Sequence, residues 1–265
     1  MDQTAALMSL ATSVPPHQFQ QKQILQAARS ILAHRYEQFE TFASLFANTG
    51  IRHRYGVKPI EWYLEPRGWP ERASAFLDGA ERLFIEVAQE AIARARLATH
   101  DIDTVVTVCS TGIATPTLEA RLASKMGFRP DVARVPVFGL GCAGGVSGLA
   151  VAARLAQSRP GSNVLLVVLE LCTLAVRHDE LTKANIVAAS LFGDGAAALA
   201  CCAPATADRR GSRRPAKNYG PTRSASWAGT STRKASAWSP AHHPRFRCRT
   251  FGSGSRRDSD AHGFE

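Results

Sequence analysis

The chain has 265 residues and is 45% hydrophobic, which is enough apolar material for a substantial core. Its formal net charge is +10, but residues 204–265 hold 13 Lys and Arg against 4 Asp and Glu, whereas residues 1–203 are nearly neutral. The basic charge therefore does not indicate a nucleic-acid or membrane surface on most of the chain. No run has the length and apolarity of a membrane span or a signal peptide, so we expect a cytoplasmic protein.

Hydrophobic patterning predicts strands and helices in alternation. The predicted strands are residues 6–11, 103–108, 163–169 and, after a turn, 191–202. The predicted helices are residues 18–34, 37–47, 73–95, 117–126 and 146–157. Residues 50–57 are expected to form a basic turn or strand, and residues 61–72 a loop. The alternation favours an α/β fold with a mostly parallel sheet.

Residues 204–265 have the composition of a segment that cannot build a core. They contain no Leu, Ile, Val or Met, and their few aromatic residues stand among Arg, Ser, Ala, Gly and Pro. We therefore divide the chain into a domain over residues 1–203 and a basic tail that we expect to be disordered. Two origins stay open for the tail: a genuine nucleic-acid-binding segment, or out-of-frame translation of a GC-rich gene.

One cysteine, Cys142, stands where an apolar run breaks at glycines and a helix of small residues begins. Gly139, Gly141, Gly144 and Gly145 permit a tight turn and leave the sulfur accessible. The N-terminal amides of the following helix point at the thiol and favour its thiolate form. We interpret Cys142 as a nucleophile and not as a buried structural cysteine.

The same glycines allow a second interpretation. Gly139, Gly141 and Gly144 spell the GxGxxG pattern of dinucleotide-binding folds, and Glu170 ends the next predicted strand, where a ribose-binding acid would stand. The acid lies 26 residues after Gly144, where about 20 is usual. The pattern alone is weak evidence, so this interpretation stays open as an alternative.

The cysteines show neither a CxxC pair nor a Cys and His spacing typical of zinc sites. They are Cys109, Cys142, Cys172, Cys201, Cys202 and Cys248. We therefore expect no metal site, and we expect the thiols to be reduced.

Four motifs occur in order along the chain. They are SLATSVPPHQFQQ near the start, STGIATPTLEARL at 110–122, GLGCAGG at 139–145 and LFGDGAAA at 191–198. With these motifs the chain resembles type III polyketide synthases, the chalcone and stilbene synthase family, and most closely their bacterial branch. The resemblance covers residues 1 to about 202. It implies a thiolase-like αβαβα fold, truncated here after its first half, and a homodimer that condenses malonyl-CoA onto an acyl-CoA starter with decarboxylation.

The resemblance also implies roles for single residues. Cys142 matches the nucleophile that takes the starter acyl group as a thioester. Phe192 matches the gatekeeper between the CoA tunnel and the reaction cavity, and Thr115 matches the residue that reaches into the neighbouring subunit's cavity. Cavity walls are matched by Ser110, Thr111, Cys172, Leu174 and Ala175. Because Ala175 is small, we expect a fatty acyl starter and alkylpyrone or alkylresorcinol products; no cofactor is implied beyond the CoA thioester substrates.

The chain also departs from the family pattern. The catalytic histidine of an HPGG-like motif and the catalytic asparagine have no match here. His243 and Pro244 are followed by Arg245 and not by glycine, and residues 251–255 read FGSGS where the family has a GFGPG-like loop. We treat both similarities as coincidental. Without these groups Cys142 should lack its base and oxyanion donors, condensation should be undetectable, and one face of the sheet core should be uncovered.

The CoA-binding positions differ as well. Where plant members carry basic residues, this chain has Thr41, Ser44 and Asn48, and we consider Arg52 and Arg54 as nearby contacts for the CoA phosphates. Two alternatives to the condensing enzyme stay open. One is a β-ketoacyl carrier-protein synthase III-like enzyme of the same fold, and the other is a non-catalytic dinucleotide-binding or nucleic-acid-binding protein.

Overall fold

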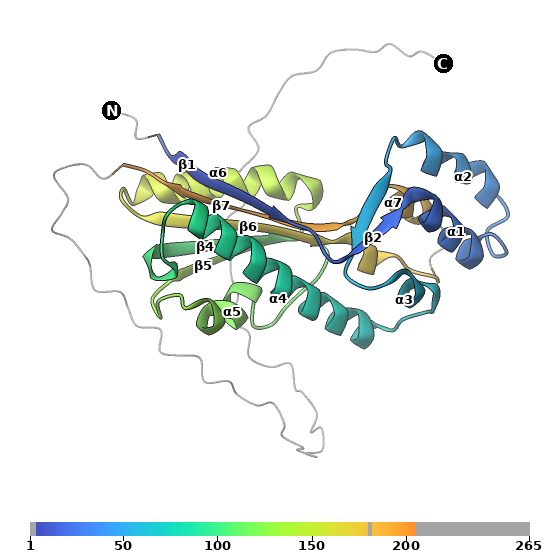
Figure 1. Ribbon diagram of the computed structural model, residues 1–265, viewed down its shortest axis with the longest axis horizontal. Coiled ribbons are helices and arrows are strands. Elements are labelled where there is room, and N and C mark those ends of the chain that lie inside the picture. Colours follow the sequence, from blue (N-terminus) through green and yellow to red (C-terminus); the bar gives the residue numbers. More distant parts are fainter. Residues whose placement is uncertain (1–3, 180–181, 205–265) are drawn as a thin grey trace, which may run out of the picture. The chain divides into compact units, whose positions relative to one another are not determined.

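A five-stranded sheet forms the centre of the computed structural model, which describes residues 4–179 and 182–204. Its strands are β1 (Ala6–Ser13), β4 (Ile102–Cys109), β5 (Ala133–Phe138), β6 (Asn163–Leu171) and β7 (Asp194–Cys202), in the order β1-β7-β6-β4-β5 (Figure 1). The strands β5, β4 and β6 are parallel, whereas β7 runs antiparallel to both of its neighbours. The α/β fold is therefore confirmed. Four of the five strands point in one direction, as expected of a mostly parallel sheet, and β7 alone among the five is reversed, which the alternation of elements does not predict.

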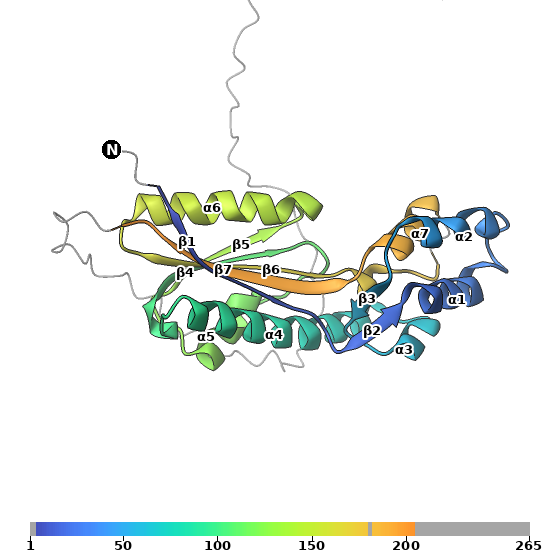
Figure 2. The same ribbon diagram turned by 45° about the horizontal axis from the view of Figure 1, so that its top comes forward.

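Helices cover both faces of this sheet. The long helix α4 (Trp69–Arg94) and the short helix α5 (Leu118–Met126) lie on one face, and α6 (Gly144–Ser158) lies on the other (Figure 2). Two hydrophobic clusters fill the spaces between the layers, one under α4 and one under α6. The described residues thus form three layers, α–β–α, around one sheet, which is one half of the five-layered arrangement expected from the thiolase-like fold.

We expected one face of the sheet to be uncovered, and this is wrong, because helices cover both faces. Because α6 packs on that face, the strands below it are buried, and residues such as Val106 and Leu166 are no more than 1% exposed. The apolar surface lies instead on the outer side of α6, where Val146 is 75% exposed and Leu149 is 45% exposed. The first two turns of α6 therefore carry small residues inward and apolar residues outward, which is typical of a helix segment buried between two layers.

A second group of elements packs around its own small core. It comprises β2 (His17–Gln20), β3 (His53–Gly56), α1 (Gln21–Leu32), α2 (Phe39–Asn48), α3 (Ile60–Leu64) and α7 (Lys183–Leu191). The strands β2 and β3 form an antiparallel ribbon, and Phe39, Phe46 and Ile186 are buried between the helices. The interpretation of residues 61–72 as a loop is wrong, because α3 and the start of α4 occupy them, and α7 was not predicted.

The predictions for the basic tail fall on residues 205–265, which lie outside the described residues, as does Cys248. Within the described part of the chain, no helix is long and apolar enough to cross a membrane.

Candidate active site

The three parallel strands end at one edge of the sheet, and their following residues meet there. Cys109 of β4 is in register with Phe138 of β5, and Val108 of β4 with Val168 of β6. The segments after these strands therefore come side by side, and they carry Ser110, the Cys142 turn and Cys172. In open α/β sheets, ligand sites form at the carboxyl ends of parallel strands, which makes this edge the candidate site.

Cys142 lies in a short turn of 3-10 helix, η2 (Gly141–Ala143), directly before α6. Gly139 and Gly141 have φ angles of 84° and 53°, which side chains rarely adopt, so the predicted tight glycine turn is confirmed. Cys142 itself is exposed. The thiol therefore stands at the N-terminal end of a 15-residue helix and is open to solvent.

Two further glycines, Gly144 in the motif and Gly148 after it, serve packing and not the turn. A methyl group on Gly144 would lie 2.7 Å from Val108 Cγ1, and one on Gly148 would lie 2.6 Å from Val108 Cγ2. Both distances are too short for real carbon contacts, so glycine lets α6 approach β4 closely. This close approach places the start of α6, and with it Cys142, against the end of β4.

The Glu170 carboxylate joins the ends of β4 and β6. It accepts hydrogen bonds from the Ser110 backbone N–H at 2.9 and 3.1 Å and from the Thr111 hydroxyl at 2.7 Å. The Thr111 hydroxyl in turn accepts from the Leu171 N–H at 2.8 Å. Both carboxylate oxygens are thus engaged within the chain, which argues against the free ribose-binding acid that the dinucleotide interpretation requires.

Ser110 extends this network to the turn that carries Cys142. The backbone N–H of Gly141 donates to Ser110 Oγ at 2.9 Å. Since Ser110 is itself held by Glu170, the chain immediately before Cys142 is tied to two neighbouring strands. The structure therefore brings together three of the predicted site residues, Ser110, Thr111 and Cys142, through these hydrogen bonds and the turn that carries Cys142.

The other described cysteines differ from Cys142. Cys109 and Cys201 are buried, and Cys172 and Cys202 are partly buried. Burial, followed by the charge of Glu170, raises the pKa of Cys172 to about 12 and also raises that of Cys109. These thiols are therefore protonated at neutral pH, which makes them poor nucleophiles.

The remaining predicted wall residues occupy different surroundings. Cys172, Leu174 and Ala175 belong to the short 3-10 helix η3 (Cys172–Ala175) after β6. Leu174 is 5% exposed and belongs to the core cluster under α4, whereas Ala175 is exposed. Thr115 is exposed on the loop between β4 and α5. Their cavity and interface roles stay predictions.

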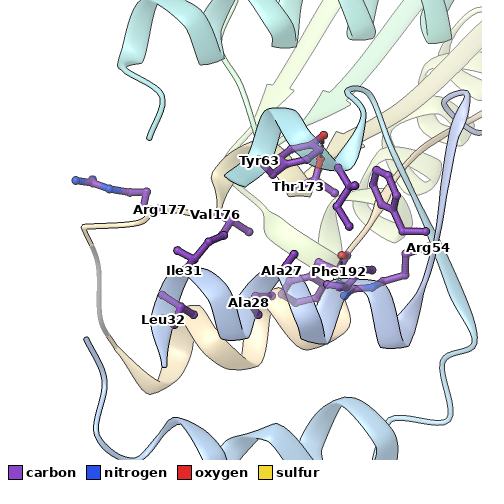
Figure 3. A pocket seen from close by; sticks show the side chains of 14 residues that line it. Ala27, Ala28, Ile31, Leu32, Arg54, Tyr63, Thr173, Val176, Arg177 and Phe192 are labelled. Carbon is purple, nitrogen blue, oxygen red and sulfur yellow. Dashed lines mark hydrogen bonds between the residues drawn. The ribbon is translucent and has the colours of Figure 1, made fainter. Parts of the chain in front are cut away.

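Phe192 follows α7 and is 44% exposed. It lines an apolar cavity on the α1 side, and its backbone carbonyl accepts a hydrogen bond from Arg54 Nη1 at 2.5 Å (Figure 3). Arg54 is only 7% exposed, so it is not placed for contact with CoA phosphates at the surface. By contrast Thr41, Ser44, Asn48 and Arg52 are all exposed.

Asp194 is buried and accepts several hydrogen bonds, a role that sequence patterns did not predict. Its carboxylate accepts from the Val57 N–H at 3.0 Å, from the Thr173 N–H at 2.8 Å and from the Thr173 hydroxyl at 2.6 Å. The Tyr63 hydroxyl lies 2.8 Å from the Thr173 hydroxyl, and since that hydroxyl donates to Asp194, Tyr63 is its donor. Burial raises the pKa of Asp194 to about 6. The one sequence feature that could have pointed to Asp194 is its position inside the LFGDGAAA motif.

Comparison with known proteins agrees with this geometry. The family model for the N-terminal domain of chalcone and stilbene synthases matches residues 2–204. The chain belongs to the chalcone and stilbene synthase family. The edge of the sheet that carries Cys142 is thus the edge where the motifs of this family gather.

Relatives and solved structures of the family share the matched region. A chalcone synthase homologue of Bacillus subtilis is 36% identical over 79% of this chain and 58% of its own length. The 1,3,6,8-tetrahydroxynaphthalene synthase of Streptomyces peucetius is 36% identical over 75% of this chain and 52% of its own length. The crystal structure of the Streptomyces coelicolor tetrahydroxynaphthalene synthase superimposes with a TM-score of 0.70 at 32% identity, covering 76% of this chain and 57% of that one. The chain therefore spans about half the length of the curated relatives it matches.

No group of three or more His, Cys, Asp or Glu side chains in the described ranges is placed to hold a metal ion.

Proposed function

We propose that this chain carries the acyl-loading site of a type III polyketide synthase, with Cys142 as the acyl acceptor. The observation that carries the proposal is the exposed Cys142 at the start of α6, on a turn fixed by Ser110. In this step the Cys142 thiolate attacks the thioester carbonyl of an acyl-CoA. The bond to the Cys142 sulfur forms, the bond to the CoA sulfur breaks, and CoA leaves as a thiol with one proton from solvent.

The proposal extends to the reaction class of the family. Family membership supports decarboxylative condensation of malonyl-CoA onto the loaded starter, with no cofactor beyond the CoA thioesters. Relatives named for 1,3,6,8-tetrahydroxynaphthalene synthesis and for alpha-pyrone synthesis support polyketide products. The expected groups for condensation, a histidine and an asparagine, have no match among these 265 residues, so we confine the first test to acyl loading.

Substrate and assembly are further parts of the proposal. The small Ala175 favours a fatty acyl starter and an alkylpyrone or alkylresorcinol product. The exposed Thr115 loop and the exposed Phe138 of the edge strand β5 support a homodimer, since both present surface that a second copy would cover. A cytoplasmic location stays part of the proposal.

Intact-mass spectrometry tests acyl loading directly. Incubation with octanoyl-CoA should add one octanoyl group to the protein, and the group should be removed by neutral hydroxylamine, which cleaves thioesters. The variant Cys142→Ala should gain no mass, whereas Cys201→Ala should load like the unmodified protein, because Cys201 is buried and burial raises the pKa of its thiol to about 11. Equal loading of Cys142→Ala would overturn the proposal.

A carrier-protein-dependent enzyme of the same fold is the second candidate. The exposed start of α6 suits either thioester donor, so the donor itself has to decide. If Cys142 accepts an octanoyl group from octanoyl-CoA but extends it only with a malonyl carrier protein, the synthase III-like alternative replaces the polyketide synthase.

A further inference from the structure

A small apolar cavity lies between α1 and the carboxyl end of α7 (Figure 3). Its volume of about 90 Å³ gives room for on the order of six to nine water-sized groups. One wall is a stripe on α1 with helical spacing, formed by Ile24, Ala27, Ala28, Ile31 and Leu32. Ile60, Val176 and Phe192 contribute apolar side chains from the other elements. Of the eight predicted site residues only Phe192 lines this cavity. Cys142, Ser110 and Thr111 do not, so the cavity is distinct from the Cys142 site.

One polar group in the cavity wall lacks a partner. Arg54 is 7% exposed, and its Nη2 is buried without a hydrogen bond. The other guanidinium nitrogens are engaged: Nε donates to Gln21 Oε1 at 3.1 Å and Nη1 donates to the Phe192 carbonyl. Figure 3 shows Arg54 at one end of the cavity, with Ile31 and Leu32 toward the other. Since a buried unpaired N–H is costly, it indicates an acceptor that is bound there.

The neighbouring charges leave this donor available. Asp194 is close enough to influence Arg54, but its carboxylate oxygens accept from Val57 and Thr173 and make no hydrogen bond to the guanidinium. Arg177 lines the opposite end, and its guanidinium pairs with Asp179 at 2.6 and 3.0 Å. The cavity therefore combines one cationic donor at one end with an apolar wall along the rest.

We propose that this cavity is a binding site for a short-chain monocarboxylate, with the carboxylate on Arg54 Nη2 and the alkyl chain along the α1 stripe. A carboxylate supplies the charge-assisted acceptor that a buried guanidinium prefers, and an alkyl chain matches the side chains of the walls. A CoA is too large for this volume, and a phosphate would meet a single orphan donor and leave the apolar wall unmatched. The proposal does not depend on acyl transfer at Cys142.

Calorimetric titration of the full chain with hexanoate tests the site. A ligand of this size should bind once per chain, with a Kd of about 1 mM. Hexan-1-ol, which has the same chain without the charge, should bind at least about tenfold more weakly, as should hexanoate to Arg54→Met. The variant Ala27→Phe fills the cavity from α1 without touching Arg54 and should abolish binding. Cys142→Ala should bind like the unmodified chain, which separates this site from the proposed function.

Three results would each overturn the proposal: no saturable binding of hexanoate, unchanged binding by Ala27→Phe, or hexan-1-ol binding as tightly as hexanoate. The first would mean that water or another segment of protein satisfies Arg54. If Arg54→Met fails to fold because it loses its bonds to Gln21 and Phe192, Ala27→Phe and hexan-1-ol decide the question without it.

Discussion

The backbone N–H of Gly141 donates a 2.9 Å hydrogen bond to the side chain of Ser110, across two segments 31 residues apart in the sequence. Gly141 directly precedes Cys142, and Ser110 directly follows β4. This bond therefore links the position of the proposed nucleophile, Cys142, to the end of a central strand. Its removal should affect reactions that need an oriented sulfur more than reactions that need only an exposed one.

The variant Ser110→Ala tests this distinction. We expect acyl transfer from octanoyl-CoA to slow by about tenfold, equivalent to about 1.4 kcal/mol, because the turn loses one fixed acceptor. Alkylation by iodoacetamide, a small reagent without a required orientation, should change little. Ser158→Ala, at the other end of α6, should change neither rate. Equal slowing of both reactions by Ser110→Ala would contradict a positioning role.

The variant Gly148→Ala should destabilise the protein. Its new methyl group would lie 2.6 Å from Val108 Cγ2 and 3.0 Å from Leu166 Cδ1, both buried, and such overpacking costs about 1–3 kcal/mol. Gly145→Ala is the matched control on the same helix, since its methyl group would meet only Val168 Cγ1 at 3.9 Å. That control should stabilise the helix by about 0.4–1 kcal/mol. Urea unfolding measures both, and equal effects would contradict the packing role of Gly148.

The Glu170 network predicts a structural role for that acid. Glu170→Gln replaces one acceptor oxygen by a donor and should lower the free energy of unfolding by about 1–3 kcal/mol. Glu90→Gln, which removes the exposed pair with Arg94, should change it by about 0.5 kcal/mol or less. NADH fluorescence should not respond to either protein. An NADH signal that Glu170→Gln abolishes would restore the dinucleotide interpretation.

The buried Asp194 gives stability a specific pH dependence. Its pKa is raised by burial from 3.8 to about 6, so between these values the folded chain binds more protons than the unfolded chain. The free energy of unfolding should therefore fall by on the order of 2 kcal/mol as the pH rises from 4 to 6. Asp194→Asn should be less stable at pH 4 but lose this slope, so its deficit shrinks toward pH 7.

A second acid, Asp179, serves as the control that assigns this pH dependence to Asp194. Asp179→Asn should leave the window from pH 4 to 6 unchanged, because the hydrogen bond from Arg177 lowers the pKa of Asp179 to about 2. Urea unfolding at several pH values measures all three proteins. Parallel pH profiles for the unmodified chain and Asp194→Asn would contradict the assignment.

The sequence alone predicted the local features of the fold correctly. The glycine turn, the strands β4 and β6 and the helix α6 follow from glycine chemistry, β-branched runs and small residues, all of which act over a few neighbouring positions. The family motifs identified the fold, and they also point to Cys142 as the nucleophile, which stays a prediction. The antiparallel direction of β7 was not predicted, because it depends on pairing with β1 and β6, which are far apart in the sequence.

The buried polar contacts were beyond the reach of sequence patterns. Arg54 reads as one residue of a basic, exposed run, and only tertiary packing buries it against Gln21 and Phe192. Glu170 reads as an acid at a strand end, and its role follows from partners about 60 residues away. Such contacts join segments distant in the sequence, so no local period reveals them.

The most direct test of the account is a competition experiment at Cys142, read by peptide mass mapping. Without substrate, iodoacetamide should modify Cys142 first among the described cysteines, since it is exposed and the others are wholly or partly buried. After incubation with octanoyl-CoA, Cys142 should carry the octanoyl group and be protected from alkylation. If Cys142 is alkylated equally with and without octanoyl-CoA, or if another cysteine carries the acyl group, it is not the acyl acceptor.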